Sequence, residues 1–265
     1  MNEIETILCK LLHCDRSTLY LDRSRLALSK RQMNRLEDIL KKRVKGAPLQ
    51  YLVGDAEFMG LRFRVRPGVL IPRPETEILV EEAIKHISKM SSSSCRILDI
   101  GTGSGNIAVS LAKASPKFKV YAVDISDICL SVARANAKLN AIEKKIRFLK
   151  SDLFGVFKGK KMKFDFIVSN PPYIAKDQLK LLPEDVRQEP VLALEAAEKG
   201  LYFYKEIEKG SRVHLAEGGA LFLEIGAGQS SGIRKIFKDQ RHWKEVKFIK
   251  DHNGIERVAI IKKHV

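Results

Sequence analysis

The residues best placed for chemistry lie in the middle of the chain, where Asn170, Pro171, Pro172 and Tyr173 follow a short apolar run. Two adjacent prolines fix φ at both positions and cannot continue a strand ladder, so we predict a rigid loop. This loop exposes two acceptors, the side-chain oxygen of Asn170 and the carbonyl of Pro171. Two such acceptors match the two hydrogens of a planar NH₂ group, as carried by adenine, cytosine, asparagine and glutamine.

Holding both hydrogens of a planar NH₂ group would control the chemistry of its nitrogen. That nitrogen is a poor nucleophile because its lone pair is delocalised. Hydrogen bonds to both of its hydrogens would decide where the lone pair points. Tyr173 is placed to pack its ring on the face of the planar group. The alternative interpretation is an ordinary strand-to-loop turn, since Asn and Pro are common turn residues.

A glycine-rich turn upstream offers a second kind of chemistry. Gly101, Gly103 and Gly105 alternate with Thr102 and Ser104 between a predicted strand and a predicted helix. Glycines here allow tight backbone angles and let a ligand approach the main chain. A dinucleotide fingerprint would need its third glycine one residue later, at position 106, where this chain has Asn. The turn therefore suits a nucleoside that lacks a pyrophosphate.

Two carboxylates end the strands that follow this turn. Asp124 ends the second predicted strand, 23 residues after Gly101, where an acid is placed for ribose hydroxyls. Asp152, with Leu153 and Phe154 behind it, follows the third predicted strand. Its carboxylate could accept from an adenine amino group while the apolar side chains sandwich the ring, or it could simply cap a turn.

The elements that must hold these residues alternate between strand and helix. Apolar runs predict buried strands at 96–100, 119–123, 146–149, 164–168 and 220–225. Helical spacing predicts helices at 75–90, 107–114, 127–140, 201–216 and 230–237. The third of these is predicted to turn Ile128 inward, and two last strands, 244–250 and 257–261, pair around a turn. We predict an α/β, doubly wound sheet with an antiparallel C-terminal edge.

The segments outside this sheet are predicted to form accessory parts. Residues 1–55 have helical periodicity, and a helix over 31–44 is expected to begin after the N-cap Ser29 and to bury Val44. Residues 56–74 alternate around Gly60 as a hairpin does and then stiffen at Pro72 and Pro74. The irregular stretch 174–199 is long enough to be a lid or binding element. We expect three parts: a helical domain at 1–55, a β-hairpin linker at 56–74 and the α/β domain at 75–265.

Composition narrows the functional class. The chain has 265 residues, with 48 Lys and Arg against 32 Asp and Glu, giving a net charge of +16. This excess favours phosphate-rich partners but also suits a plain solvated surface. Because the chain has no apolar run of about 18 residues and its acidic start does not resemble a signal peptide, we expect a cytoplasmic protein with no membrane contact. The cysteines and histidines show no metal-binding spacing, so we expect no metal.

Taken together, these motifs resemble known enzymes. The turn from Asp99 to Gly105, with Asp124, is similar to the S-adenosylmethionine site of Rossmann-like methyltransferases. The sequence NPPY at 170–173 is similar to the signature of those that methylate planar amino groups. PGVLIPRPETE at 67–77 is narrower and resembles the HemK/PrmC family, which methylates the glutamine amide in the Gly-Gly-Gln motif of peptide chain release factors. The likeness covers essentially the whole chain, including VRQEP at 186–190 and the closing region 251–258.

The chain departs from the family pattern at two places. The stretch 195–201 reads EAAEKGL, where the family usually carries glycines and an acid. Leu153 stands where the family often has a Trp, so stacking on adenine would pass to Phe154 or weaken. The first departure concerns the local geometry of a loop and the second concerns cofactor packing.

The resemblance implies S-adenosylmethionine as cofactor and release factors as protein substrate, with work close to the ribosome, and we expect a monomer. It implies that the cofactor is bound by Gly101, Thr102, Gly103, Ser104, Gly105, Asp124, Asp152, Leu153, Phe154 and Asn170. The substrate would contact Asn170, Pro171, Pro172, Tyr173, Arg73 and Glu75. Catalysis would fall to Asn170, Pro171 and Tyr173.

Two other functions stay open on the sequence. An adenine-amino methyltransferase of DNA or RNA would use the same chemistry, and the basic charge favours it, whereas the segment PRPETE and the lack of an obvious target-recognition domain count against it. A non-catalytic ribosome- or nucleic-acid-binding protein could retain a nucleoside pocket. The intact Asn170, Asp124 and three glycines argue against this second alternative.

Overall fold

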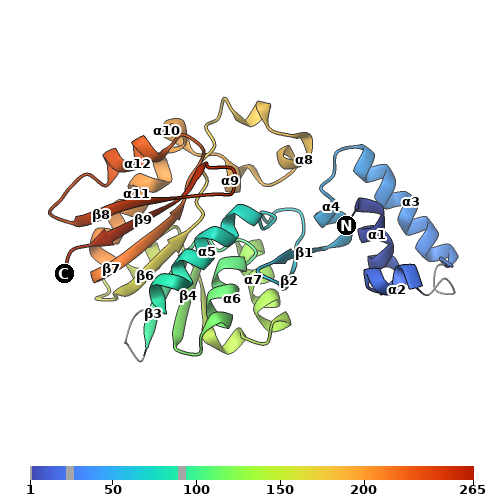
Figure 1. Cartoon of the computed structure of the whole chain (residues 1–265), viewed down its shortest axis with the longest axis horizontal. Helices are drawn as coiled ribbons and strands as arrows, with labels where there is room; N and C mark the ends of the chain where they lie inside the picture. Colours follow the sequence, from blue (N-terminus) through green and yellow to red (C-terminus); the bar gives the residue numbers. More distant parts are fainter. Residues whose placement is uncertain (1, 22–26, 89–93) are drawn as a thin grey trace.

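The computed structural model describes residues 2–21, 27–88 and 94–265, and within them the largest element is a seven-stranded sheet (Figure 1). The strands follow the order β5-β4-β3-β6-β7-β9-β8. Their bounds are β3 Cys95–Ile100, β4 Phe118–Asp124, β5 Ile146–Lys150, β6 Phe164–Ser169, β7 Leu215–Glu224, β8 Trp243–Lys250 and β9 Glu256–Lys263. Strands β3 to β7 pair in parallel, whereas β9 is antiparallel to both of its neighbours. The predicted Rossmann-like sheet with its antiparallel C-terminal edge is confirmed.

Both faces of the sheet are covered, which explains why its strands are continuous apolar runs. The helices are α5 Pro74–Ile87, α6 Asn106–Ala114 and α7 Asp127–Leu139 on one face, and α11 Tyr202–His214 and α12 Ser230–Ile236 on the other (Figure 1). Because successive strand residues point to opposite faces, Ile97 belongs to the core under α5 and α6, while Leu98 belongs to the core under α11.

The strand order changes direction between β3 and β6, the pair at the centre of the sheet. The chain that leaves β3 leads to β4 and the chain that leaves β6 leads to β7, so the two connections leave in opposite directions. A crevice opens at such a switch point, and ligands of open α/β sheets bind there. The Ser169 hydroxyl donates to the Ile100 carbonyl at 2.8 Å and ties the two strand ends together.

The N-terminal helices form a group of their own beside the sheet (Figure 1). They are α1 Glu3–Leu12, α2 Arg16–Leu21, α3 Lys30–Val44 and α4 Leu49–Val53. Capping boxes at Asn2 and Ser29 start α1 and α3, the second at the predicted N-cap. Ile7, Leu11, Ile39 and Val53 make a small separate core.

A hairpin and a proline-stiffened segment connect these helices to the sheet. Strands β1 Asp55–Phe58 and β2 Leu61–Arg64 pair antiparallel around Met59 and Gly60, which both have positive φ. Asn136 of α7 clamps this hairpin, accepting from the Arg64 N–H at 2.7 Å and donating to the Arg64 carbonyl at 3.0 Å. The Tyr51 hydroxyl donates to the Val69 carbonyl at 2.7 Å.

The predicted lid contains only short turns, namely η4 Leu179–Leu181, α8 Glu184–Arg187, α9 Val191–Leu194 and α10 Ala197–Gly200. Elsewhere η2 Glu143–Lys145 and η3 Gly155–Phe157 are similar single turns. The lid reaches the N-terminal helices, because the Gln188 side chain donates to the Lys45 carbonyl at 3.0 Å. Glu198 and Lys199 adopt left-handed backbone angles, with φ of 56° at each.

Two details of the predicted helices are wrong. Val44 is 88% exposed because the apolar stripe of α3 turns away from the small core before the helix ends. Ile128 is 46% exposed, and α7 instead buries a face of small and polar residues that includes Ala133 and Asn136. Helix α5 ends at Ile87, and the predicted end at residue 90 lies outside the described residues.

No helix in the described part of the chain is long and apolar enough to cross a membrane.

Candidate active site

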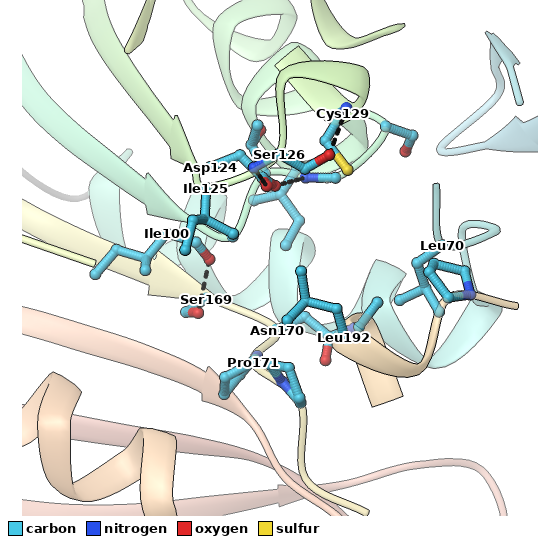
Figure 2. A pocket seen from close by; sticks show the side chains of 18 of the residues that line it. Leu70, Ile100, Asp124, Ile125, Ser126, Cys129, Ser169, Asn170, Pro171 and Leu192 are labelled. Atoms are coloured by element: carbon cyan, nitrogen blue, oxygen red, sulfur yellow. Dashed lines mark hydrogen bonds between the residues drawn. The ribbon is translucent and has the colours of Figure 1, made fainter. Parts of the chain in front are cut away.

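A cavity of about 340 Å³ lies at the carboxyl ends of β3, β4 and β6, in the crevice that the strand order predicts. Figure 2 shows Asp124, Ile125 and Ser126 on one side of it and Asn170, Pro171 and Leu192 on the other. The predicted site residues that line it are Arg73, Gly101, Thr102, Gly103, Ser104, Asp124, Asp152, Leu153, Asn170, Pro171 and Pro172. The fold therefore gathers segments that are almost 100 residues apart in the chain.

The glycine-rich turn presents main chain to the cavity. Gly101 and Gly103 have φ of 71° and 54°, which only glycine adopts at little cost. A methyl group added at Gly101 would meet no atom within 4 Å, so the backbone is open on that side. Gly105 has another role, because a methyl group there would lie 2.9 Å from Ala133 Cβ and push α6 away from α7.

Asp124 is held rigidly at the edge of this turn. Its Oδ2 accepts the Gly103 N–H at 2.8 Å, and its Oδ1 accepts the Ser126 N–H at 2.9 Å. A carboxylate has about four lone-pair positions, so two remain for a ligand. Burial raises the pKa of Asp124, and the bonds from Ser126 and Gly103 act against that rise.

A second acid lies directly beneath the turn. Asp99 is fully buried, and its Oδ2 accepts from the Thr102 hydroxyl at 2.6 Å. Burial raises the pKa of Asp99 to about 7, and the nearby Asp124 charge adds to the rise. Asp99 thus tethers Thr102, and it does so from below the cavity wall.

The NPPY loop lines the cavity with the two residues that carry its acceptors, Asn170 and Pro171. The Asn170 Nδ2 donates to the Thr76 hydroxyl at 3.2 Å, so the amide oxygen is turned the other way. Within the described residues, no group donates to Asn170 Oδ1 or to the Pro171 carbonyl. Two acceptors are therefore left without a donor, and their binding of a planar NH₂ group stays a prediction.

Tyr173 lies behind the loop, and the expectation that it packs on a substrate is not met. Its hydroxyl donates to Glu224 Oε1 at 3.4 Å, and its carbonyl accepts from Gln229 Nε2 at 3.0 Å. A methyl group at Gly200 would lie 2.2 Å from that carbonyl, so the following loop packs closely against it. The proline-locked loop carries the ring inward, where it fills space beside β7.

Phe154 also points away from the cavity and corrects a second expectation. Its ring stacks on His214 with centroids 5.4 Å apart and planes 10° apart, in the core beneath α11. Leu153 has a positive φ of 44°, and this turn leaves Leu153 and Asp152 on the cavity wall while sending Phe154 into the core. The simple alternation of side chains along an extended strand does not predict this change of direction.

The linker contributes the predicted residue Arg73, and α5 contributes Thr76, which sequence reasoning did not assign to the site. Arg73 lines the cavity and forms an ion pair with Glu189, whose other oxygen accepts the Ile71 N–H at 2.9 Å. Thr76 is buried at the cavity wall and holds Asn170. Glu75 is not part of the lining, although its charge acts on the buried Glu224. A buried Thr one turn into an acidic helix start carries no local signal.

Comparisons with known proteins match both parts of the chain. A family model described as the PrmC N-terminal domain matches residues 1–54, and one described as the Methyltransferase small domain matches residues 75–188. The crystal structure of the N-terminal domain of human METTL16 in complex with SAH has the same fold, with a TM-score of 0.55 at 20% identity over 85% of this chain and 82% of that one.

Two curated relatives are similar over most of the chain. The release factor glutamine methyltransferase of Salmonella typhimurium is 41% identical over 228 residues, 86% of this chain and 80% of that protein. The release factor glutamine methyltransferase of Thermodesulfovibrio yellowstonii is 38% identical over 264 residues, 99% of this chain and 92% of that protein. This identity covers most of each chain, and the chain belongs to the release factor glutamine methyltransferase family.

Proposed function

We propose that this protein transfers a methyl group from S-adenosylmethionine to the side-chain amide nitrogen of the glutamine in the Gly-Gly-Gln motif of release factors, in the cytoplasm. The observation that carries this proposal is the pair of free acceptors, Asn170 Oδ1 and the Pro171 carbonyl, in the cavity that the glycine-rich turn also lines. Family membership supports glutamine as the owner of the NH₂ group.

The lining of the cavity fits S-adenosylmethionine. Gly101 and Gly103 leave the main chain open to a nucleoside, and Asp124 has free lone pairs for ribose hydroxyls. Leu153 supplies an apolar surface for adenine, with the exposed carboxylate of Asp152 next to it. When bound, the cofactor supplies an electrophilic methyl group on a sulfonium.

The protein's part in the reaction is to position the glutamine amide. Asn170 Oδ1 and the Pro171 carbonyl each accept one amide hydrogen, which turns the nitrogen lone pair toward the methyl group. Holding two reactants in line can remove several kcal/mol of the barrier. Both acceptors also stabilise the positive charge that develops on nitrogen. No residue needs to act as general base, because the alkylated nitrogen is acidic and releases its proton to water.

The mouth of the cavity supports a protein substrate. Leu192 is 64% exposed and Tyr202 is 40% exposed, and both also line the cavity. These apolar side chains are suited to cover the backbone of a loop that delivers its glutamine into the cavity. The helical domain at 1–55 is joined to the lid through Gln188 and Lys45, and we assign it a role in docking the remainder of the release factor.

Tandem mass spectrometry tests this function. The purified protein is incubated with S-adenosylmethionine and a bacterial release factor, and the peptide that contains Gly-Gly-Gln is sequenced. One added methyl group on the glutamine side chain is the expected product. A release factor with Gln replaced by Glu is the matched control and should stay unmodified. An unmodified wild-type peptide, with active cofactor present, would contradict the proposal.

A further inference from the structure

Glu224, at the carboxyl end of β7, is a buried acid that lies outside the cavity lining. It is 2% exposed, yet its two oxygens reach groups from two different segments. Oε2 accepts from the Thr76 hydroxyl of α5 at 2.6 Å, and Oε1 accepts from the Tyr173 hydroxyl at 3.4 Å. Burying an ionised acid costs free energy unless other groups bond to it, so the groups that bond to Glu224 indicate its role.

The partners form a short chain of hydrogen bonds that ends at Asn170. A threonine hydroxyl has one proton, and Thr76 gives that proton to Glu224. Toward its other neighbour the hydroxyl can therefore only accept, and it accepts from the Asn170 NH₂ group at 3.2 Å. With the NH₂ group bonded to Thr76, the Asn170 oxygen is the atom of this amide that is left for a ligand in the cavity that Asn170 lines.

We propose that Glu224, acting through Thr76, is a positioning residue that fixes which way the Asn170 amide faces and so makes the cavity an acceptor for the substrate NH₂ group. This inference rests on the proposed function for its role in catalysis. The hydrogen-bond chain itself stands on the geometry alone. Thr76 on α5 and Glu224 on β7 would therefore help the NPPY loop to orient Asn170.

Protonation of Glu224 would reverse the direction of the chain. A neutral carboxyl group can donate to the Thr76 oxygen, which frees the Thr76 proton to point at Asn170. The Asn170 amide is then favoured in the flipped orientation, with its NH₂ group toward the cavity. Two NH₂ groups would face each other there, and the substrate would lose one of its two acceptors. The ionised form of Glu224 is therefore the competent form.

The surroundings of Glu224 set the pH at which this switch occurs. Burial raises its pKa to about 7, the bonds from Thr76 and Tyr173 lower it, and Glu75 of α5 raises it. Arg257 of β9 lowers the pKa of Glu224. Tyr204 of α11 donates to the backbone carbonyl oxygen of Glu224 at 3.0 Å. Since a carboxyl group loses its proton above its pKa, the competent fraction rises as the pH increases through about 7.

Single-turnover methyl transfer to a release-factor fragment tests the inference, measured from about pH 5.5 to 9 with cofactor affinity alongside. The wild-type rate should rise about tenfold across neutral pH. Glu224→Gln should lower the rate at high pH by about tenfold or more and flatten this rise, with cofactor affinity unchanged within about twofold. Asp99, whose pKa burial also raises to about 7, is unchanged in this variant and bonds to Thr102 of the glycine-rich turn.

Two substitutions at Thr76 keep the test decisive if Glu224→Gln does not fold. Thr76→Ser retains the hydroxyl and should keep the rate within about threefold of wild type, whereas Thr76→Val should lose about tenfold or more. Equal rates for the Ser and Val variants would overturn the inference. So would a Glu224→Gln enzyme with the pH profile of the wild type.

A second readout does not depend on the substrate. In protein labelled with ¹⁵N-asparagine, the Asn170 side-chain NH₂ signals should shift with a midpoint near pH 7, and this shift should vanish in Glu224→Gln. Signals that do not respond to pH in the wild type would overturn the inference. If the wild type leaves release factor unmodified while these signals titrate, the proposed function fails and the positioning role of Glu224 survives.

Discussion

The two walls of the cavity are built in different ways. The wall with the glycine-rich turn consists of main chain, and its key carboxylate, Asp124, is bonded to Gly103, only 21 residues away. The wall with the NPPY loop consists of side chains held from far away, since Asn170 is 94 residues from Thr76 and Thr76 is 148 residues from Glu224. The first wall is a local motif, whereas the second exists only once the sheet is complete.

This difference predicts how each wall responds to mutation. Changes on the glycine-rich wall should alter cofactor affinity, because that wall presents its backbone and one acid directly to the cavity. Changes on the NPPY wall should alter the rate of transfer, because its groups orient the substrate and touch little of the cofactor region. The following variants test that separation, in order of decreasing effect.

Removing the Asn170 side chain should have the largest effect. Asn170→Ala deletes one of two acceptors, so the substrate NH₂ group can rotate, and we expect transfer to fall by about 10²–10³. Asn170→Asp keeps an acceptor but adds a charge beside the sulfonium, so it should bind cofactor at least as well and turn over more slowly. Single-turnover kinetics and calorimetry measure the two effects. Near-normal transfer by Asn170→Ala would show that other groups orient the substrate.

Asp124→Ala should act on the opposite wall. The variant leaves ribose hydroxyls unpaired, and we expect a loss of about 1–3 kcal/mol in cofactor binding, measured by calorimetry. Asp127→Ala is a suitable control, since its carboxylate is 73% exposed and pairs only with Lys150 at the surface. Unchanged cofactor affinity in Asp124→Ala would remove this residue from the site.

Deletion of residues 1–55 extends the comparison beyond the cavity. Because every predicted cofactor residue lies after residue 100, cofactor affinity should stay within about twofold. We expect kcat/KM for an intact release factor to fall by about tenfold, with a short Gly-Gly-Gln peptide affected less, since the lost contacts are remote from the reacting amide. Equal turnover of the intact protein would reduce this domain to a stabilising cap.

The smallest effect concerns the loop that supports Tyr173. Lys199 has a left-handed backbone, a conformation that costs a non-glycine residue about 1–2 kcal/mol. Glycine removes this strain but loses about 0.5–1 kcal/mol more chain entropy on folding. Lys199→Gly should therefore gain about 0.5 kcal/mol in free energy of unfolding, whereas Lys199→Ala, which keeps the strain, should gain nothing. Denaturant titration compares the two, and equal stabilities would contradict this account.

The same contrast explains what could be predicted from sequence. Most strand positions, the glycine-rich turn and the place of Asn170 on the cavity wall follow from local residue order, whereas β7 begins at Leu215, inside the predicted helix 201–216. The stretch 195–201, where the chain departs from the family pattern, contains Glu198 and Lys199 in left-handed positions. Sequence patterns predict a structural feature correctly where that feature depends on residues close together in the chain.

The failures involve contacts made across the fold. Phe154 and Tyr173 were expected in the cavity, but both rings lie in the core. The left-handed turn at Leu153 directs Phe154 there. Hydrogen bonds with Glu224 and Gln229 hold Tyr173 there. Thr76 lies inside the PRPETE motif but was not assigned to the site, and Glu224 gave no signal in the sequence, because the importance of both comes from a bond that links α5 to β7. No pattern of neighbouring residues encodes such a bond.

A competition experiment tests the central claim, that this site holds a protein amide, most directly. The protein receives S-adenosylmethionine with a labelled methyl group, together with equal amounts of release factor and of total bacterial RNA and DNA. We predict that the label is recovered in the release factor, on the glutamine of Gly-Gly-Gln, and that Asn170→Ala abolishes it. Label on adenine amino groups of the nucleic acid, with the release factor unlabelled, would contradict the account and favour the nucleic-acid methyltransferase that the net charge of +16 also suits.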